Sequence, residues 1–296
     1  MSLKLLLTDT SNALGRALEH ELERESFHLF IPGSDDLDWN KPTSVAQYVR
    51  VVRPDVVINC AGWEDITDPS QHTLLTKAAS HIAEACAPLG IPLIHFSSYR
   101  VFGGDNKSTH SEKDIPTPNS DAGHAFLAAE QVIKQHLEKW IAVRLSWIVG
   151  SYGENHLTRL LRSLSSEQAV SVSSRLRGAP TALSDAARVA VAMAKQITCG
   201  AENWGVMHYC SADACTEAEF AEQVLQVWRQ CQGTVTDDKA LDILDQLPPD
   251  EPVSAVLTCT LARDYFGIQA RAWRPSLLPM IKQWLHAQSQ KAGAVD

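Results

Sequence analysis

The sequence predicts an α/β fold, with a doubly wound parallel sheet followed by a smaller mixed α/β subdomain. Short apolar runs alternate with helical patterns through the first half of the 296 residues, and each strand-plus-helix step takes about 30 residues, as right-handed crossovers do. After residue 150 this alternation loosens. We therefore expect a first domain over 1–150, a smaller subdomain over 151–286 that is partly interleaved with it, and a disordered tail over 287–296.

Apolar runs locate the strands of the first domain, and amphipathic stretches locate the helices between them. The helix that contains LLTKAASHIAEAC places Leu and Ala on one face and stops at Gly90. In chain order we expect strand 4–9, helix 14–25, strand 28–33, helix 44–52, strand 55–62, helix 72–90, strand 92–98, a long loop over 100–120, helix 123–139 and strand 140–147.

The second half contains helical patterns and one clear strand-like run. The helix that begins at Thr216 carries a capping box, because Glu219 stands three residues later. We expect helices over 155–164, 184–197, 216–231 and 276–287, and a strand over 205–211.

Composition excludes several classes of protein. A hydrophobic content of 45% excludes a fibrous or disordered chain. A net charge of −9 without a long run of Lys or Arg argues against nucleic acid or a membrane as a partner. No apolar run reaches the roughly 18 residues of a spanning helix, and the first ten residues do not form a signal peptide, so we expect a cytoplasmic protein.

Cysteine and histidine patterns do not indicate a metal site. The seven cysteines have no CxxC spacing and the eleven histidines make no HExxH pair. We expect buried thiols and no metal.

Blocks of sequence along nearly the whole chain resemble the extended short-chain dehydrogenase/reductases, most closely the dTDP-4-dehydrorhamnose reductase family. The resemblance is carried, in order, by PDVVINCAG, LIHFSSYRVFGG, AVRLSWIVGSYGENHLTRLL, RGAPTALSDAARVA, GVMHYCSADACTEAEFA and EPVSAVLTCTLARDYFGIQARAWRPSLL. Enzymes of that family reduce a 4-keto sugar nucleotide with NAD(P)H. The resemblance therefore implies a Rossmann-like NAD(P)-binding domain and a substrate-type subdomain.

The glycine-rich loop of the family is degenerate in this chain. Against the family pattern GxxGxxG, the chain has Asp9, Asn12 and Gly15. The resemblance places the cofactor against Asn12, Ala13, Leu14 and Gly15, but a carboxylate about 4 Å from a phosphate charge would cost on the order of 4 kcal/mol. We expect weak or absent NAD(P) binding. The alternative is a plain turn in which Asp9, Ser11 or Asn12 caps the helix.

The family's catalytic Tyr-x-x-x-Lys pair is absent. The four-residue spacing puts both side chains on one helix face, and here these positions hold Ala122 and Phe126. A general acid typically contributes ~10²–10⁴-fold to the rate, so we expect no useful turnover by the family mechanism. His124 lies two residues along the helix, roughly 200° around its axis, and points away.

The remaining site residues come from the resemblance, each with a structural alternative. Ser98 is the remnant of the catalytic site, or a serine that bonds to its own loop. Asp38, Cys60, Ala61 and Gly62 are candidates for cofactor contact, although Asp38 also suits a turn and the other three suit a tight strand-to-helix connection. The candidates for substrate contact are Tyr99, Arg144, Trp147 and Asn155, and Trp147 is equally suited to a core.

These patterns leave three hypotheses. The first is a catalytically impaired member of the fold that binds a small nucleotide or sugar nucleotide, or regulates a protein partner. The second is an active NAD(P)H-dependent reductase of a 4-keto sugar nucleotide. The third is a protein that binds a different ligand, such as a mononucleotide or an S-adenosyl compound, in the same cleft.

Overall fold

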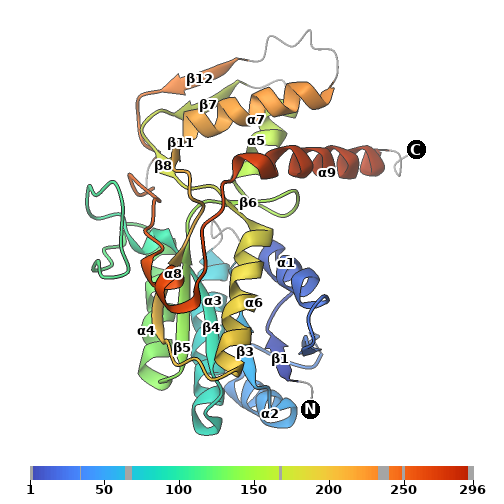
Figure 1. Ribbon diagram of the computed structural model, residues 1–296, viewed down its shortest axis with the longest axis vertical. Helices are drawn as coiled ribbons and strands as arrows, with labels where there is room; N and C mark the ends of the chain where they lie inside the picture. Colours follow the sequence, from blue (N-terminus) through green and yellow to red (C-terminus); the bar gives the residue numbers. More distant parts are fainter. Residues whose placement is uncertain are drawn as a thin grey trace.

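Six parallel strands form the central sheet of the protein, for which a computed structural model describes residues 3–33, 35–63, 69–166, 169–232, 240–248 and 251–292 (Figure 1). The strands are β1 (Lys4–Leu7), β2 (His28–Phe30), β3 (Val56–Asn59), β4 (Leu93–Ser98), β5 (Trp140–Leu145) and β10 (Gly205–Tyr209). Their order is β10-β5-β4-β3-β1-β2. The predicted doubly wound sheet is confirmed, and its order reverses between β1 and β3, where such sheets bind ligands.

Helices cover both faces of the sheet because side chains alternate along each strand. Leu5 and Leu7 pack in one core with α1 (Ala13–Leu22) and α6 (Leu183–Thr198). Leu6 packs in the other core with α2 (Pro42–Val52), α3 (Pro69–Cys86) and α4 (Asp121–His136). All three leucines are 0% exposed, and burial of each contributes about 1.5–3 kcal/mol. Two short 3₁₀ helices, η1 (Ala87–Leu89) and η2 (Tyr99–Val101), follow α3 and β4.

Part of the second half of the chain lies on the central sheet. After β5 the chain leaves the sheet. It comes back to the sheet with α6, which packs on one face, and with β10, which pairs with β5. Helix α8 (Thr260–Phe266) then packs in the same core as α1 and α6, through Ala262 and Phe266. Residues that we expected in the second subdomain thus complete the layers of the first.

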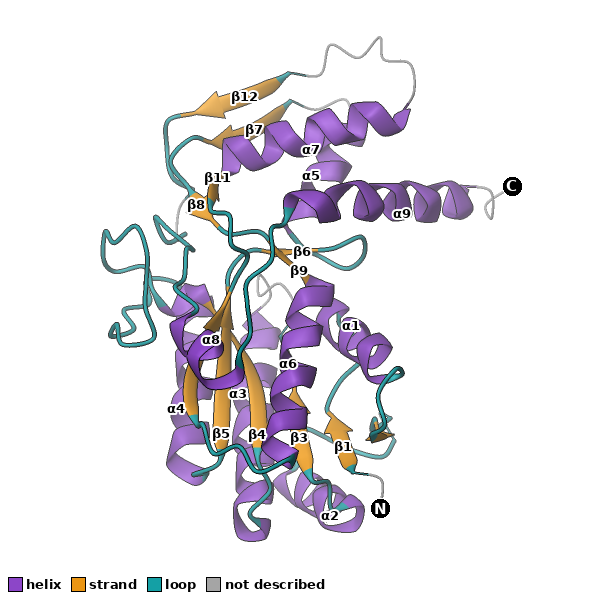
Figure 2. Cartoon of the chain, in the orientation of Figure 1, coloured by secondary structure: helices purple, strands orange, loops and turns teal. Residues whose placement is uncertain are grey.

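The remaining elements form a smaller layer beyond the carboxyl ends of the strands (Figure 2). It contains α5 (His156–Ser165), α7 (Glu217–Gln232) and α9 (Arg274–Ala292), with β7 (Val170–Ser173) paired to β12 (Leu241–Leu244) and β8 (Arg177–Gly178) paired to β11 (Cys215–Thr216). At its base, β6 (Ile148–Val149) pairs with β9 (Thr181–Ala182). These short strands were not predicted from the sequence.

The capping box of α7 is confirmed. The Glu219 amide donates to the Thr216 hydroxyl at 3.1 Å, and the Thr216 amide donates to the Glu219 carboxylate at 2.8 Å.

The prediction of a disordered tail over 287–296 is wrong for residues 287–292, which continue α9. Ile281 and Trp284 anchor the helix in the core, and Gln290 contacts the ring of His286 one turn earlier at 2.9 Å. Residues 293–296 lie outside the described residues.

The cysteines are all free thiols, four of them buried (Cys60, Cys86, Cys210 and Cys215). Cys199 is exposed, contrary to the expectation, because it follows the last turn of α6 where the chain faces solvent.

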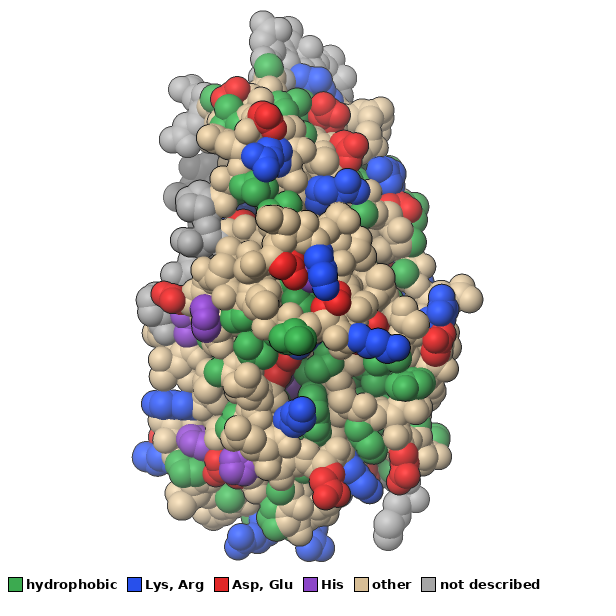
Figure 3. All heavy atoms as spheres, turned by 90° about the vertical axis from the view of Figure 1, so that its left-hand side faces the viewer, with side chains coloured by type: hydrophobic (Ala, Val, Ile, Leu, Met, Phe, Trp, Pro, Cys, Tyr) green, Lys and Arg blue, Asp and Glu red, His purple; other side chains and the backbone are tan. Residues whose placement is uncertain are grey.

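On the face shown in Figure 3, acidic and basic side chains of the described residues are interspersed, and neither charge forms a continuous patch. In the described part of the chain, no helix has the length and apolar character needed to cross a membrane, and no three His, Cys, Asp or Glu side chains are grouped as metal ligands would be.

Candidate functional site

The loop between β1 and α1 lies at the point where the strand order reverses, and Asn12 organises it. The Asn12 side-chain oxygen accepts the Gly15 amide at 2.8 Å and caps α1. Its side-chain nitrogen donates to the Cys60 carbonyl at 2.9 Å, which ties the loop to the end of β3. Gly15 is required here, because a Cβ would lie 1.9 Å from the Asp9 carbonyl oxygen.

The Asp9 carboxylate folds back onto this loop. One oxygen accepts the Ser11 backbone amide at 2.7 Å, and the other accepts the Asn12 side-chain nitrogen at 2.9 Å. Backbone amides at the start of a helix are the groups that bind phosphate in nucleotide-binding loops. In this chain the Asp9 carboxylate already accepts one of these amides, that of Ser11.

A second loop, residues 150–155, packs against the start of α1. A Cβ on Gly153 would lie 2.5 Å from the Cβ of Ala13, and the Arg16 guanidinium lies 5.1 Å from the Tyr152 ring. Ala13 is 5% exposed beneath this loop, Asn12 is 2% exposed, and Leu14 is 0% exposed in the core. These proposed cofactor residues offer little free surface in the structure.

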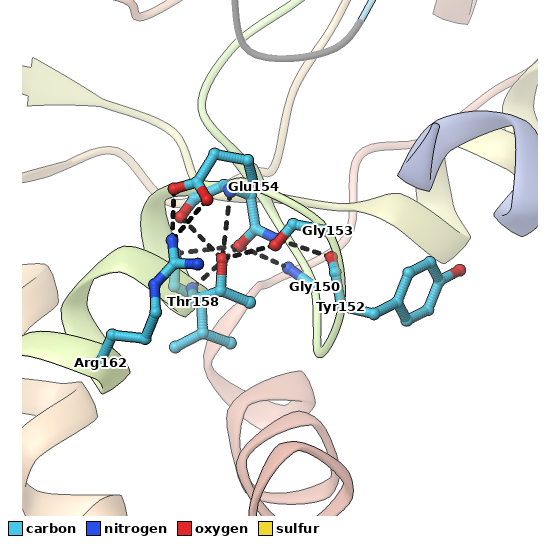
Figure 4. A network of polar contacts seen from close by, with 8 residues as sticks. Gly150, Tyr152, Gly153, Glu154, Thr158 and Arg162 are labelled. Atoms are coloured by element: carbon cyan, nitrogen blue, oxygen red, sulfur yellow. Dashed lines mark hydrogen bonds and ion pairs between the residues drawn. The ribbon is translucent and has the colours of Figure 1, made fainter. Parts of the chain in front are cut away.

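The loop 150–155 is held by the polar network in Figure 4. Thr158 donates to the Gly153 carbonyl at 2.8 Å, and Glu154 forms an ion pair with Arg162. Asn155 caps α5 by accepting the amides of Leu157 and Thr158 at 3.0 and 3.2 Å. Asn155, a candidate for substrate contact, uses its side chain to shape the loop.

A cleft of about 60 Å³ opens beyond the end of β4 and is lined by Ser98, Tyr99, Phe126 and Asn155. Ser98 lies in it as expected, but its hydroxyl accepts the Arg100 amide at 3.3 Å and caps η2. Phe126 is 3% exposed and Ala122 is 8% exposed, so both proposed catalytic positions are apolar and packed. His124 is exposed and bonds to the Ser120 carbonyl, as its position on the helix predicted.

Among the described residues that line this cleft, neither Tyr99 nor His156 is suited to give up a proton near neutral pH. The Tyr99 hydroxyl donates to Glu251 at 3.0 Å, and burial raises its pKa far above the usual range. Burial, followed by the charges of Arg159 and Arg100, holds the pKa of His156 well below its usual range, which keeps the imidazole neutral.

The cleft contains residues that the sequence did not indicate. Trp63 follows the Cys60–Gly62 turn directly, and its ring nitrogen lies 3.5 Å from the Ser97 carbonyl. Arg100 pairs with Glu251 at 2.6 Å across 151 residues of chain, a contact that no local pattern could reveal. Arg159 also lines the cleft, four residues after Asn155 on the same face of α5, and that spacing was a signal available in the sequence.

Two candidates for substrate contact lie outside this cleft. Arg144 is 2% exposed and forms two hydrogen bonds with Glu130, at 2.8 and 2.6 Å. Trp147 is 1% exposed and packs so closely on β8 that a Cβ on Gly178 would lie 2.2 Å from its ring. The Arg144 guanidinium is already paired with a carboxylate in the interior. Trp147 belongs to the core, which is the alternative role that the sequence allowed for this residue.

The remaining cofactor candidates form local structure. Asp38 accepts the Asn40 amide and lies 3.1 Å from Lys41; these two contacts hold the pKa of Asp38 below its usual value, as suits a turn. Cys60 and Ala61 are buried, and Gly62 has φ +69° with no room for a Cβ, which would lie 2.6 Å from the Leu75 amide. The three form a tight connection from β3.

Comparisons with known proteins agree on one family. The sequence profile of the family described as RmlD substrate binding domain matches residues 3–286. A dTDP-4-dehydrorhamnose reductase of Burkholderia thailandensis is 25% identical over 287 residues, which cover 92% of this chain and 96% of the relative. The crystal structure of dTDP-4-dehydrorhamnose reductase from Bacillus anthracis in complex with NADP superposes with a TM-score of 0.80 at 23% identity, covering 96% and 99% of the two chains. MoeE5 in complex with UDP-glucose and NAD superposes with a TM-score of 0.79 at 19% identity, covering 96% and 99%.

Proposed function

Because the chain belongs to the RmlD substrate binding domain family of dTDP-4-dehydrorhamnose reductase-like proteins, we propose that it binds a nucleotide or sugar nucleotide without reducing it. Its role is then that of a binding or regulatory protein. Reduction of a carbonyl requires a bound hydride donor and a group that protonates the developing alkoxide.

The observation that carries the proposal is the pair Ala122 and Phe126. The resemblance puts a tyrosine and a lysine at these positions, and both side chains here are apolar and at most 8% exposed. Tyr99 and His156 do not replace them, because the first is held by Glu251 with a raised pKa and the second is held neutral. A carbonyl beside Ser98 would meet one hydroxyl and an apolar ring.

The Asp9 loop supports the second half of the proposal, that NAD(P) binds weakly or not at all. A dinucleotide phosphate would compete with the Asp9 carboxylate for the Ser11 amide and would meet its negative charge. The loop 150–155 also covers Ala13 at the start of α1. Both features argue for weak or absent binding of a dinucleotide, without which hydride transfer has no donor.

The cleft retains features suited to a phosphorylated sugar. Arg100, Arg159 and Ser98 line it together, and guanidinium groups recognise phosphate oxygens through paired hydrogen bonds. UDP-glucose, which MoeE5 holds in its complex, belongs to this chemical class. We therefore propose a nucleoside diphosphate sugar as the ligand. A cleft of about 60 Å³ has room for no more than a phosphate group of it, so the nucleoside and the sugar would lie outside the cleft.

Titration of the purified chain tests the proposal. NADH, NADPH, dTDP and UDP-glucose are each followed by calorimetry and by thermal shift. We expect a nucleoside diphosphate or its sugar to bind and both dinucleotides to bind more weakly than about 100 μM. Steady oxidation of NADPH in the presence of a 4-keto sugar nucleotide would overturn the proposal and establish the active-reductase alternative.

A second measurement restores the residues of the family pattern at positions 9, 122 and 126. We expect Ala122→Tyr with Phe126→Lys and Asp9→Gly to bring back measurable NADPH binding. The matched control is the Ala122→Tyr and Phe126→Lys pair alone, which leaves the Asp9 carboxylate in place and is expected to bind NADPH no better than the native chain.

A further inference from the structure

Cys210 and Cys259 bring two thiols together away from the cleft. Cys210 follows the last residue of β10, Cys259 precedes α8, and their sulfur atoms lie 3.6 Å apart. All seven cysteines fall within the described residues, and no other pair of their sulfurs makes a contact in this part of the chain. A close pair of thiols that no disulfide joins is a chemically distinct feature of the fold.

Hydrogen bonds hold the two sulfurs face to face. The Cys210 amide donates to the Cys259 sulfur at 3.2 Å, and the Cys210 thiol donates to the Leu257 carbonyl at 3.1 Å. A disulfide bond is about 2.05 Å long, so from 3.6 Å the sulfurs need to approach by about 1.5 Å. Rotations about the two side chains have to supply this movement.

The surroundings fix the backbone on both sides of the pair. The Thr258 amide donates to the His110 carbonyl at 2.8 Å, next to Cys259, and Cys210 directly follows the paired strand β10. Cys210 is 3% exposed, whereas Cys259 is only half-buried, so we expect a small oxidant to approach the pair from the Cys259 side. The contact with the Cys259 thiol lowers the pKa of Cys210, an effect that burial opposes.

We infer that Cys210 and Cys259 form an oxidation site at which hydrogen peroxide converts the two thiols into an intramolecular disulfide. The thiolate of one cysteine attacks a peroxide oxygen, the O–O bond breaks, and the other oxygen leaves as water, which gives a sulfenic acid. The second thiol attacks the sulfenic sulfur, the S–O bond breaks and a second water leaves. The two thiols lose two electrons and two protons, and hydrogen peroxide is reduced to two waters.

The cross-link would connect the sheet to the segment 251–259. At the other end of this segment Glu251 contacts Tyr99 and Arg100, two residues that line the cleft. The oxidation site is therefore linked through the chain to the residues that shape the cleft, although its chemistry requires no ligand.

Mass spectrometry of the full chain tests the inference. The protein is treated with hydrogen peroxide, its remaining thiols are alkylated, and it is digested without reduction. We expect a loss of about 2 Da, two fewer alkylated cysteines, and a linked peptide that joins Cys210 to Cys259 and disappears on reduction.

Variants separate this pair from general thiol oxidation. Cys210→Ser and Cys259→Ser should each abolish the linked peptide, whereas Cys86→Ser, a change at a thiol that is 0% exposed, should leave it in place. A native chain that keeps both thiols after treatment, that links a different pair, or that forms a sulfinic acid at Cys259 without a cross-link would overturn the inference. Because no ligand enters this measurement, its outcome is independent of the nucleotide titrations.

Discussion

Replacement of Asp9 by Asn is the sharpest perturbation of the nucleotide loop. The change removes one negative charge and keeps a side-chain oxygen that can still accept the Ser11 amide, now at 2.7 Å from the carboxylate. The Asn12 nitrogen, 2.9 Å from the second carboxylate oxygen, loses one acceptor but keeps the Cys60 carbonyl. The loop should therefore hold its shape, at a cost of about 1 kcal/mol in the free energy of unfolding.

The expected gain in NADPH affinity follows from the position of the carboxylate. A phosphate oxygen that binds the Ser11 amide would bring its charge within about 4 Å of Asp9, where repulsion is worth about 4 kcal/mol at an effective dielectric constant of 20 and about 1 kcal/mol in water. The Asp9 side chain is half-buried, so the true value lies between these limits. The dissociation constant should fall by between about fivefold and about a thousandfold.

Isothermal titration calorimetry with NADPH measures this change, and thermal melting verifies that each variant is folded. Glu222→Gln on the exposed surface of α7 is the matched control, because it removes the same charge from the molecule without touching the loop. Equal affinities for the native chain and Asp9→Asn, or a native dissociation constant below ~10 μM, would refute the argument from charge.

Three further predictions concern the stability of the fold, each measured by urea unfolding. Gly15→Ala should lower the free energy of unfolding by about 2 kcal/mol or more, because its Cβ would lie 1.9 Å from a backbone oxygen. In the control Gly33→Ala the nearest neighbour of the Cβ lies at 3.3 Å, so the free energy of unfolding should change little. Equal effects of the two variants would contradict the packing at the loop. Glu130→Gln should lower the free energy of unfolding by about 3–5 kcal/mol, because it leaves the Arg144 guanidinium, which is 2% exposed, without its charge partner. A loss below about 1 kcal/mol would show that the pair is dispensable. Burial lowers the pKa of His95 and of His208 from 6.5 to about 3, so between these pH values the unfolded chain binds protons that the folded chain does not, and stability should fall as the pH drops. From about pH 7 to about pH 5 each of these two histidines should contribute about 2 kcal/mol of this loss, and the double change to Asn should remove their two contributions while that of His156 remains; an unchanged pH dependence would refute the assignment.

Local patterns were enough to predict the elements whose chemistry is local. The capping box at Thr216 and Glu219 lies within one helical turn and appears as expected. The apolar runs of the parallel strands were recognisable because both faces of the sheet are buried, as the 0% exposure of Leu5, Leu6 and Leu7 shows.

Contacts between distant segments could not be predicted in the same way. Arg144 was expected at the substrate, since its type and position suit that role, but Glu130 reaches it from α4 and neutralises it within the core. Tyr99 meets Glu251 across 152 residues of chain. Such partners depend on how helices and loops pack over the sheet, which periodicity does not specify. A polar residue at a strand end therefore identifies the edge where a site lies, but does not decide whether that residue faces the ligand.

Phe126 and Asp9, on which the proposed loss of reductase chemistry depends, also suit the fold without a ligand. A lysine at position 126 would place an ammonium group where Phe126 is now 3% exposed, and such a charge is costly without a partner. In the same way, the Asp9 carboxylate accepts an amide at the start of the loop that would otherwise depend on a ligand or water. Both side chains therefore stabilise the state without a ligand. A ligand that avoids the Asp9 loop and enters from the side of Arg100 and Arg159 leaves the contacts of Asp9 and Phe126 in place, and competes with Glu251 for Arg100. This asymmetry is the physical reason to expect a sugar nucleotide to bind more readily than a dinucleotide.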